Sequence, residues 1–221
     1  MGIFKSLLNF VFPEENICLF CKDYRVEGKF HICSSCQGFI EFVHREISSP
    51  IPYVEKAYYS VLYTRLIREN IHAFKFEGKS YLYKAFGDIL LETIYEKGLH
   101  EKVDLIAFVP MDRMKKAQRG YNQCELMARY LSKKMDKPLL KDNIIKVKVT
   151  KEQNRLGLTE RRTNLKDSFK AVKVEDFKAK EILLIDDIIT TGTTMKEISK
   201  VLINNGARKV YGLAITSSMK I

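Results

Sequence analysis

The apolar residues of the chain recur with two different periods, and their alternation predicts strands followed by helices. Short runs rich in β-branched and aromatic residues predict strands, which we expect at residues 57–63, 103–109, 182–185 and 209–215. Apolar positions three and four residues apart predict amphipathic helices, which we expect at residues 64–77, 86–94 and 118–135 and directly after Gly192. This alternation indicates an α/β fold with a mostly parallel, doubly wound sheet.

One predicted strand leads into an acidic, threonine-rich segment. The apolar run 182–185 is followed by Asp186 and Asp187, and then by threonines around Gly192 that open a helix. Ligands of open α/β sheets bind beyond the carboxyl ends of the strands, so a ligand site is expected here. Hydroxyls and backbone N–H groups at a helix start suit a phosphate, and paired carboxylates suit ribose hydroxyls or a hydrated Mg²⁺. Ordinary Rossmann-like packing is the alternative interpretation.

The length and composition favour one α/β domain with a small appendage. The 221 residues are 46% hydrophobic and 29% charged, which is typical of a soluble globular protein. No apolar run approaches the roughly 20 residues that span a bilayer. Residues 1–12 are apolar but carry neither a basic leader nor a small-residue cleavage site. We therefore expect them to pack against the body, and we expect a cytoplasmic protein without a membrane span.

The positive charge of the chain is concentrated in its middle. The formal net charge is +11, and the segment from Pro110 to Lys170 holds 17 Lys and Arg residues against 7 Asp and Glu residues. A pocket for a polyphosphate accounts for a few of these cations. A surface that contacts nucleic acid would use many more, through phosphate contacts. Lysine-rich, solvated helices are the other explanation.

Four of the five cysteines form two Cys-x2-Cys pairs, and these are Cys18, Cys21, Cys33 and Cys36. Two such pairs can complete a tetrahedral site of four sulfurs, so we expect a structural zinc ion. Disulfides are the alternative, and the absence of a secretory signal disfavours them. His31 and His44 are not needed as ligands when four cysteines are present. Cys124 stands alone in a helical pattern and is expected to be a small buried apolar residue.

Five motifs follow one another along nearly the whole chain. They are, in order, the double Cys-x2-Cys pattern, Phe74–Lys79, Val109–Met111, Gln118–Gln123 and residues 182–194. The segment 182–194 by itself resembles the 5-phosphoribosyl-1-pyrophosphate (PRPP) signature of type I phosphoribosyltransferases. The order of the five motifs resembles the ComF family (ComFC/GntX-like), phosphoribosyltransferase-like proteins associated with DNA uptake in competent bacteria.

The resemblance implies a role for each motif. The acidic pair would hold the ribose hydroxyls of PRPP, with Mg²⁺, and the 5′-phosphate would lie on the loop formed by Thr190, Thr191, Gly192, Thr193 and Thr194. A pyrophosphate loop would consist of Val109, Pro110, Met111, Asp112 and Arg113, although many relatives are more basic where Asp112 stands. A mobile region over the pocket would consist of Arg119, Gly120, Tyr121, Asn122 and Gln123.

Several basic residues have two interpretations. Arg119 is either a phosphate or nucleic-acid contact or a solvated arginine at a helix start. Lys75 is either a cation of the pocket or a helix-end lysine favoured by the dipole. The stretch 153–164 resembles the polar border of the family's site and is equally typical of a basic surface helix; its candidates are Arg155, Arg161, Arg162 and Asn164.

These observations predict a zinc-knuckle domain at residues 1–50 and a phosphoribosyltransferase-like domain at residues 51–221. No base-specific hood is recognisable, so we assign no catalytic base. The resemblance implies a PRPP-binding protein of natural competence that contacts single-stranded DNA and, through the family's association, a competence helicase. The alternative is an active phosphoribosyltransferase that acts on an unknown nucleobase-type acceptor and has no role with DNA.

Overall fold

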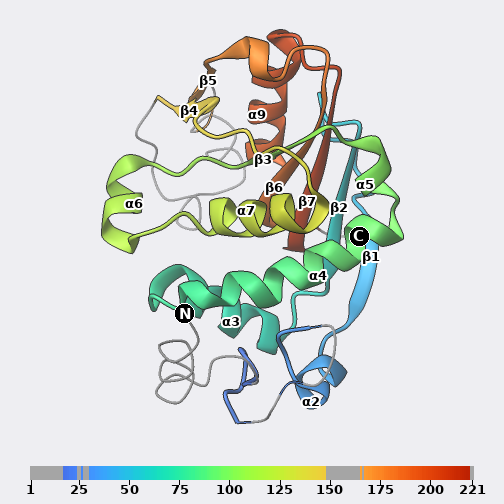
Figure 1. Cartoon of the computed structure of the whole chain (residues 1–221), viewed down its shortest axis with the longest axis vertical. Helices are drawn as coiled ribbons and strands as arrows, with labels where there is room; N and C mark the ends of the chain where they lie inside the picture. The colour runs from blue at the N-terminus through green and yellow to red at the C-terminus, as the bar shows by residue number, and fades with distance from the viewer. Residues whose placement is uncertain (1–16, 24–25, 27–29, 148–164, 166, 220–221) are drawn as a thin grey trace, which may run out of the picture.

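The computed structural model describes residues 17–23, 26, 30–147, 165 and 167–219, and a five-stranded sheet organises them (Figure 1). The strand order is β1-β2-β7-β6-β3, in which β1 is antiparallel to β2 and the other neighbours are parallel. The strands are β1 (Phe42–Glu46), β2 (Lys56–Val61), β3 (Leu105–Phe108), β6 (Glu181–Ile189) and β7 (Lys209–Ser217). The predicted α/β class with a mostly parallel sheet is confirmed.

Helices cover both faces of this sheet, because its central strands alternate apolar side chains between two cores. Leu183 and Ile185 of β6 face a core shared with α3, α4, α7 and the cysteine-containing segment. Ile182 and Leu184 face a second core that α9 completes. The helices and short helical turns are α2 (Ser34–Gly38), α3 (Arg65–Phe76), η1 (Ser80–Leu82), α4 (Tyr83–Glu96), α5 (Leu99–Lys102), α6 (Arg113–Arg119), α7 (Gln123–Met135), η3 (Val174–Asp176) and α9 (Thr193–Asn204).

The expected single helix over 118–135 is wrong, because two helices, α6 and α7, meet here with residues 120–122 between them. Gly120 has a φ of +85° and ends α6, so Gln118 and Arg119 belong to the end of that helix. The next helix begins at Gln123 because the side chain of Asn122 accepts a hydrogen bond from the N–H of Cys124. The motif 118–123 is therefore a tight connection between two helices.

The strand before the acidic pair is longer than the predicted run 182–185. Pairing with β7 continues through Asp186 and reaches Ile189, so both aspartates lie inside β6. The polar turn begins at Thr190. The predicted strand ended at residue 185 because the apolar run ends there. The observed strand continues because hydrogen bonding between strand backbones does not depend on apolar side chains.

Two pieces of the fold have no counterpart in the prediction. Strand β1 extends the main sheet from within the residues assigned to the knuckle, and the domain boundary at residue 50 stays a prediction. Strands β4 (Ile144–Lys146) and β5 (Phe169–Ala171) form a separate antiparallel pair beside α9. None of the helices in the described part of the chain is long and apolar enough to cross a membrane.

Candidate functional site

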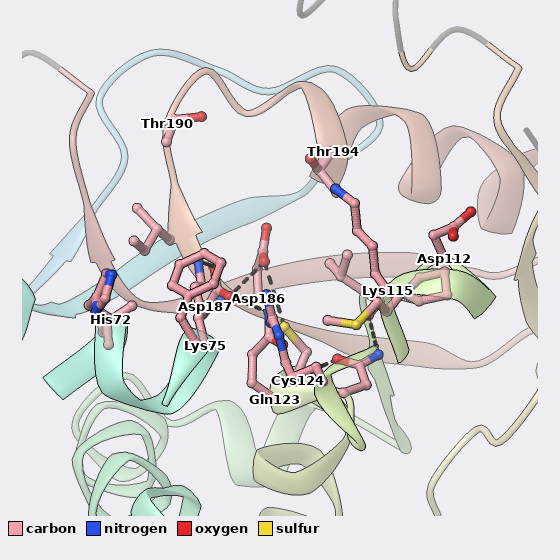
Figure 2. Close-up of a pocket in the computed structure, with 18 of the residues that line it drawn as sticks. His72, Lys75, Asp112, Lys115, Gln123, Cys124, Asp186, Asp187, Thr190 and Thr194 are labelled. Carbon is pink, nitrogen blue, oxygen red and sulfur yellow. Dashed lines mark hydrogen bonds and ion pairs between the residues drawn. The ribbon is translucent and has the colours of Figure 1, made fainter. Parts of the chain in front are cut away.

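An open cleft of about 1010 Å³ lies beyond the carboxyl ends of β3 and β6. Its walls come from α3, from the segment between β3 and α7, and from the loop that opens α9. Figure 2 shows Asp186 and Asp187 in its centre, the threonine loop on one side and the side chains of α3 and α7 on the other. The parallel order of β3 and β6 brings these walls together, because loops that follow parallel neighbours emerge at the same edge.

The acidic pair is held by three side chains from two helices. The Nζ of Lys75, on α3, lies 2.8 Å from Oδ1 of Asp187, and the amide of Gln123, on α7, donates to the other oxygen at 2.6 Å. The thiol of Cys124 lies 3.7 Å from Oδ1 of Asp186, which also accepts the N–H of Asp187 at 2.8 Å. Both aspartates therefore have defined positions in the cleft.

The electrostatics of the pair follow from burial and from mutual repulsion. Burial, together with the negative charge of Asp187, raises the pKa of Asp186 to about 7. Burial lowers the pKa of Lys75, but the two carboxylates outweigh it and the net shift is upward, so Lys75 carries its charge. Burial raises the pKa of Cys124, which is a neutral thiol at physiological pH. The expected burial of Cys124 is confirmed. Its contact with Asp186 was not predicted, because periodicity does not show which distant residue a buried side chain contacts.

The loop between β6 and α9 opens a helix at the border of the cleft. Gly192 has a φ of +69° and provides no side-chain oxygen to cap α9. The hydroxyls of Thr191 and Thr193 lie 2.8 Å apart, and a hollow of about 10 Å³ lies between the loop and Asp186. Thr190 and Thr194 line both this hollow and the large cleft. The positive end of the α9 dipole thus lies at the loop that borders the cleft.

The segment after β3 forms the opposite wall. Val109, Pro110 and Met111 line the cleft. Asp112 also lines it, but its carboxylate accepts the N–H of Met114 at 2.9 Å and caps α6. Arg113 begins α6 and is exposed outside the residues that line the cleft.

The connection between α6 and α7 is tied to its surroundings. The hydroxyl of Tyr121 donates to the carbonyl of Phe74 at 2.5 Å, and the amide of Asn122 donates to the carbonyl of Val109 at 2.9 Å. Arg119 donates to Gln123 and lies over the ring of Phe76. Arg119, Asn122 and Gln123 line the cleft, whereas Gly120 and Tyr121 are outside its lining.

Sequence reasoning missed most of the contribution of α3. Arg68, His72 and Phe76 line the cleft together with Lys75, and their spacing of four residues places them on one face of the helix. The spacing of four residues is visible in the sequence, but only the position of α3 beside the cleft identifies this helix face as part of the site. Lys146 of β4 also lines the cleft, where burial and the nearby charge of Lys115 lower its pKa. The candidates Arg155, Arg161, Arg162 and Asn164, and the apolar segment 1–12, lie outside the described residues.

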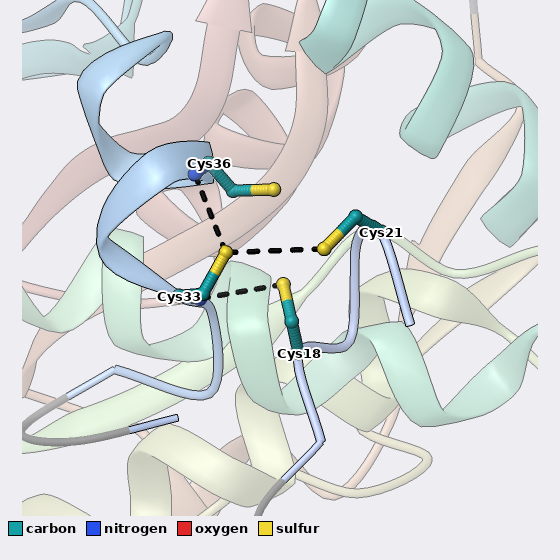
Figure 3. A group of neighbouring side chains, drawn as sticks. All are labelled: Cys18, Cys21, Cys33 and Cys36. Carbon is teal, nitrogen blue, oxygen red and sulfur yellow. Dashed lines mark hydrogen bonds between the residues drawn. The ribbon is translucent and has the colours of Figure 1, made fainter. Parts of the chain in front are cut away.

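The four clustered cysteines meet at one point, as Figure 3 shows. Their sulfurs all lie within 4.8 Å of one another, and none of the described cysteines is in a disulfide. The Sγ atoms of Cys21 and Cys33 are 3.8 Å apart, close to the edge of about 3.8 Å that a tetrahedron with metal–sulfur bonds of about 2.3 Å requires. Backbone N–H groups outweigh burial and lower the pKa of Cys18 to about 7. This donor set fits a closed metal site.

His31 and His44 point to other partners. His31 Nδ1 lies 2.6 Å from Asp88 of α4, and His44 Nδ1 lies 2.8 Å from the hydroxyl of Thr93. The carboxylate of Asp88 also accepts the hydroxyl of Tyr130, on α7, at 2.5 Å. Asp88 therefore joins the cysteine-containing segment to the helix that carries Gln123 and Cys124.

Sheet order, acidic pair and helix-opening loop together define a phosphoribosyltransferase-type domain. A family model described as "Phosphoribosyl transferase domain" matches residues 121–216, which include β6, the acidic pair, α9 and most of β7. The chain is 35% identical to Competence protein F of Haemophilus influenzae over 150 residues, which are 65% of this chain and 66% of that protein. The chain belongs to the ComF family of phosphoribosyltransferase-like proteins, as the motif order predicted.

Two other relatives differ in how much of the chain they cover. Competence protein ComFC of Bacillus subtilis is 26% identical over 205 residues, 88% of this chain and 80% of that protein. DNA utilization protein YhgH of Escherichia coli O157:H7 is 31% identical over 144 residues, 63% of this chain and 62% of that protein. The match thus spans somewhat less than two thirds of the Haemophilus and Escherichia relatives.

Proposed function

We propose that the cleft binds PRPP with Mg²⁺ and that the protein acts in natural competence, in contact with single-stranded DNA. The observation that carries this proposal is the placement of the start of α9, whose N-cap residue is Gly192, directly beside the buried acidic pair. A phosphate on the loop Thr190–Thr194 would leave the ribose hydroxyls of the same molecule within reach of Asp186 and Asp187. The relatives' printed names, competence protein and DNA utilization protein, support the biological role.

The residues around the acidic pair suit a ribose that carries a phosphate at one end and a pyrophosphate at the other. Asp186 and Asp187 would accept the two ribose hydroxyls, and the ion pair with Lys75 at 2.8 Å would hold the carboxylate of Asp187 in place. The wall Val109–Asp112 would face the pyrophosphate. Mg²⁺ would supply the remaining positive charge for that leaving group, because Asp112 contributes a negative charge and Arg113 lies outside the cleft lining.

The proposed metal of the cysteine cluster is zinc, in a structural role. Four thiolates with no remaining ligand position make a closed site, and such a site stabilises a segment that is too small to hold a core of its own. Cys18, Cys33 and Cys36 are themselves part of the core that contains α4. A metal there would therefore fix this segment against the body that carries the cleft.

A contact with single-stranded DNA is supported by the cations around the cleft. Arg68, Lys115, Arg119 and Lys146 all line it, and phosphate contacts of this kind make binding steeply dependent on salt. The second candidate function is an active phosphoribosyltransferase that transfers the ribosyl group to a nucleobase-type acceptor without a role in DNA handling. The cleft of about 1010 Å³ is larger than the space around the acidic pair alone. An acceptor could therefore bind in the rest of the cleft, which supports the second candidate.

Calorimetry with PRPP and Mg²⁺ tests the pocket. Wild-type protein is expected to bind, and the double variant Asp186→Ala/Asp187→Ala is expected to lose binding. The matched control Glu69→Ala/Glu96→Ala removes two exposed carboxylates outside the cleft and should bind as the wild type does. Equal affinity for PRPP in the wild type and the aspartate variant would refute the assignment of Asp186 and Asp187 to the PRPP site. Release of pyrophosphate, with nucleobases or with single-stranded DNA, distinguishes turnover from binding.

A further inference from the structure

An exposed aromatic ring stands at the mouth of the cleft. Phe76 is the last residue of α3, and 56% of it is exposed although it lines the cleft. Tyr63, just before the same helix, is also exposed and lines the cleft. Exposed rings forgo the free energy of burial, and rings that border a polar cleft are typical contacts of a ligand.

One neighbour of this ring is a cation and another is an imidazole ring. The guanidinium carbon of Arg119 lies 5.2 Å from the centre of the Phe76 ring, and the ring of His72 lies 5.0 Å from it. Arg68 follows one turn further along the same face of α3. A flat π-system linked to phosphate matches this combination of an aromatic surface and positive charge.

The ring is also connected to the acidic pair by two short routes. Lys75, its neighbour in the sequence, pairs with Asp187 at 2.8 Å. Arg119, which covers the ring, donates to Gln123, and Gln123 in turn donates to Asp187 at 2.6 Å. A group that binds on Phe76 would therefore lie beside whatever Asp187 holds.

We infer that Phe76 is the stacking platform for a nucleobase and that the guanidinium of Arg119, which lies over the ring in this structure, moves aside for the base and contacts its edge. This inference rests on the proposed function, which places the ribose of PRPP at the acidic pair. Helix α3 would thereby provide the wall that recognises the base, which no motif in the sequence indicated. The base is a purine or pyrimidine, and it comes either as a free base or as part of a single strand.

The fluorescence of 2-aminopurine tests this inference, since stacking on an aromatic ring quenches it. The chain contains no Trp, so the probe can be excited without a tryptophan background. The probe is offered in two forms, as the free base and within a single-stranded oligonucleotide, each with and without PRPP and Mg²⁺. Quenching of the free base identifies an acceptor subsite, and quenching of the oligonucleotide alone identifies a DNA contact; either supports the platform.

Variants separate stacking from general apolar contact. Phe76→Leu keeps an apolar side chain without a π-face and should weaken the affinity for the probe roughly ten-fold, whereas Phe76→Tyr should retain it. The control Phe39→Leu changes a ring that is 72% exposed and outside the cleft, and it should quench as the wild type does. Because Phe76 is exposed, thermal unfolding of each variant should match that of the wild type.

Calorimetry with PRPP on the same samples distinguishes the two proposals. Absence of quenching in the wild type, or equal quenching in the wild type and Phe76→Leu, overturns the platform even where PRPP binds normally. Quenching that depends on Phe76 in a protein that does not bind PRPP upholds the platform and overturns the proposed ribose site.

Discussion

Lys75 and Asp187 form an ion pair that joins α3 to the middle of β6. The Nζ of Lys75 lies 2.8 Å from Oδ1 of Asp187, and only 20% of the lysine side chain is exposed. Neighbouring Asp186 brings a second carboxylate into the same space. The lysine is thus the counterion for two adjacent acids.

Replacing this lysine should destabilise the protein. Lys75→Met leaves Asp187 with the amide of Gln123 as its remaining described partner, and we expect a loss of about 3 kcal/mol in the free energy of unfolding. The double variant Lys75→Met/Asp187→Asn should recover part of this loss, because it removes the uncompensated charge. Denaturant unfolding measures both. The control Lys79→Met breaks an exposed pair with Glu77 and should cost little.

The stability of the ligand-free protein should depend on the ionisation of Asp186. Its pKa is about 7 in the folded chain and about 3.9 in an unfolded chain. Between these values the folded chain holds a proton that the unfolded chain has lost, so the free energy of unfolding falls as the pH rises. Asp186→Asn should flatten this decline and raise the unfolding temperature above about pH 7. A decline of the same slope in wild type and variant contradicts the assignment.

Gly192 should tolerate a side chain less well than Gly78. Both glycines have a φ of +69°, but a Cβ at Gly192 would lie 2.8 Å from Cδ1 of buried Ile51, and a Cβ at Gly78 would have no neighbour within 4 Å. Gly78→Ala should cost about 1 kcal/mol for its left-handed backbone alone. Gly192→Ala should cost at least about 2 kcal/mol, since a steric clash is added. Equal costs in urea unfolding would contradict the close contact.

The hydrogen bond from Tyr130 to Asp88 should contribute to the stability of the whole body. Tyr130→Phe removes a donor 2.5 Å from a buried carboxylate that His31 also contacts, and we expect a loss of about 2 kcal/mol. Tyr95→Phe on α4 removes an exposed hydroxyl and should change the free energy of unfolding by less than about 0.5 kcal/mol. If the free energy of unfolding of Tyr130→Phe equals that of the wild type, the hydrogen bond between Tyr130 and Asp88 does not stabilise the protein.

Metal analysis should find about one zinc ion per chain, as a site of four sulfurs requires. Cys33→Ser should lower the zinc content and the unfolding temperature, because the segment that carries it packs in the core around α4. Cys124→Ser is the matched control, since Cys124 is also buried but lies in the cleft, and its zinc content should equal that of the wild type. A folded, metal-free protein would refute the zinc site.

Much of the fold and part of the site follow from local pattern. Alternating strands and helices predicted the sheet class, and the residues from Asp186 to Thr194 predicted where a ligand would bind. Periodicity failed where a single backbone position decided the outcome, as at Gly120, whose positive φ separates α6 from α7. It also failed for β1, because an edge strand of five residues with a partly exposed face has little apolar pattern.

The sequence by itself determined four of the strands in the main sheet and most of the long helices. It also determined the acidic pair, the helix-opening glycine loop and the spacing of the cysteines, because each of these depends on residues close together in the chain. Only the tertiary structure decided that Lys75 and Gln123 bind Asp187, that Cys124 reaches Asp186 and that Phe76 borders the cleft. These contacts join α3, α7 and β6, and they exist because the order of the strands brings those elements to one edge of the sheet. Local periodicity specifies which face of a helix is apolar, but it carries no information about which distant strand that helix will meet.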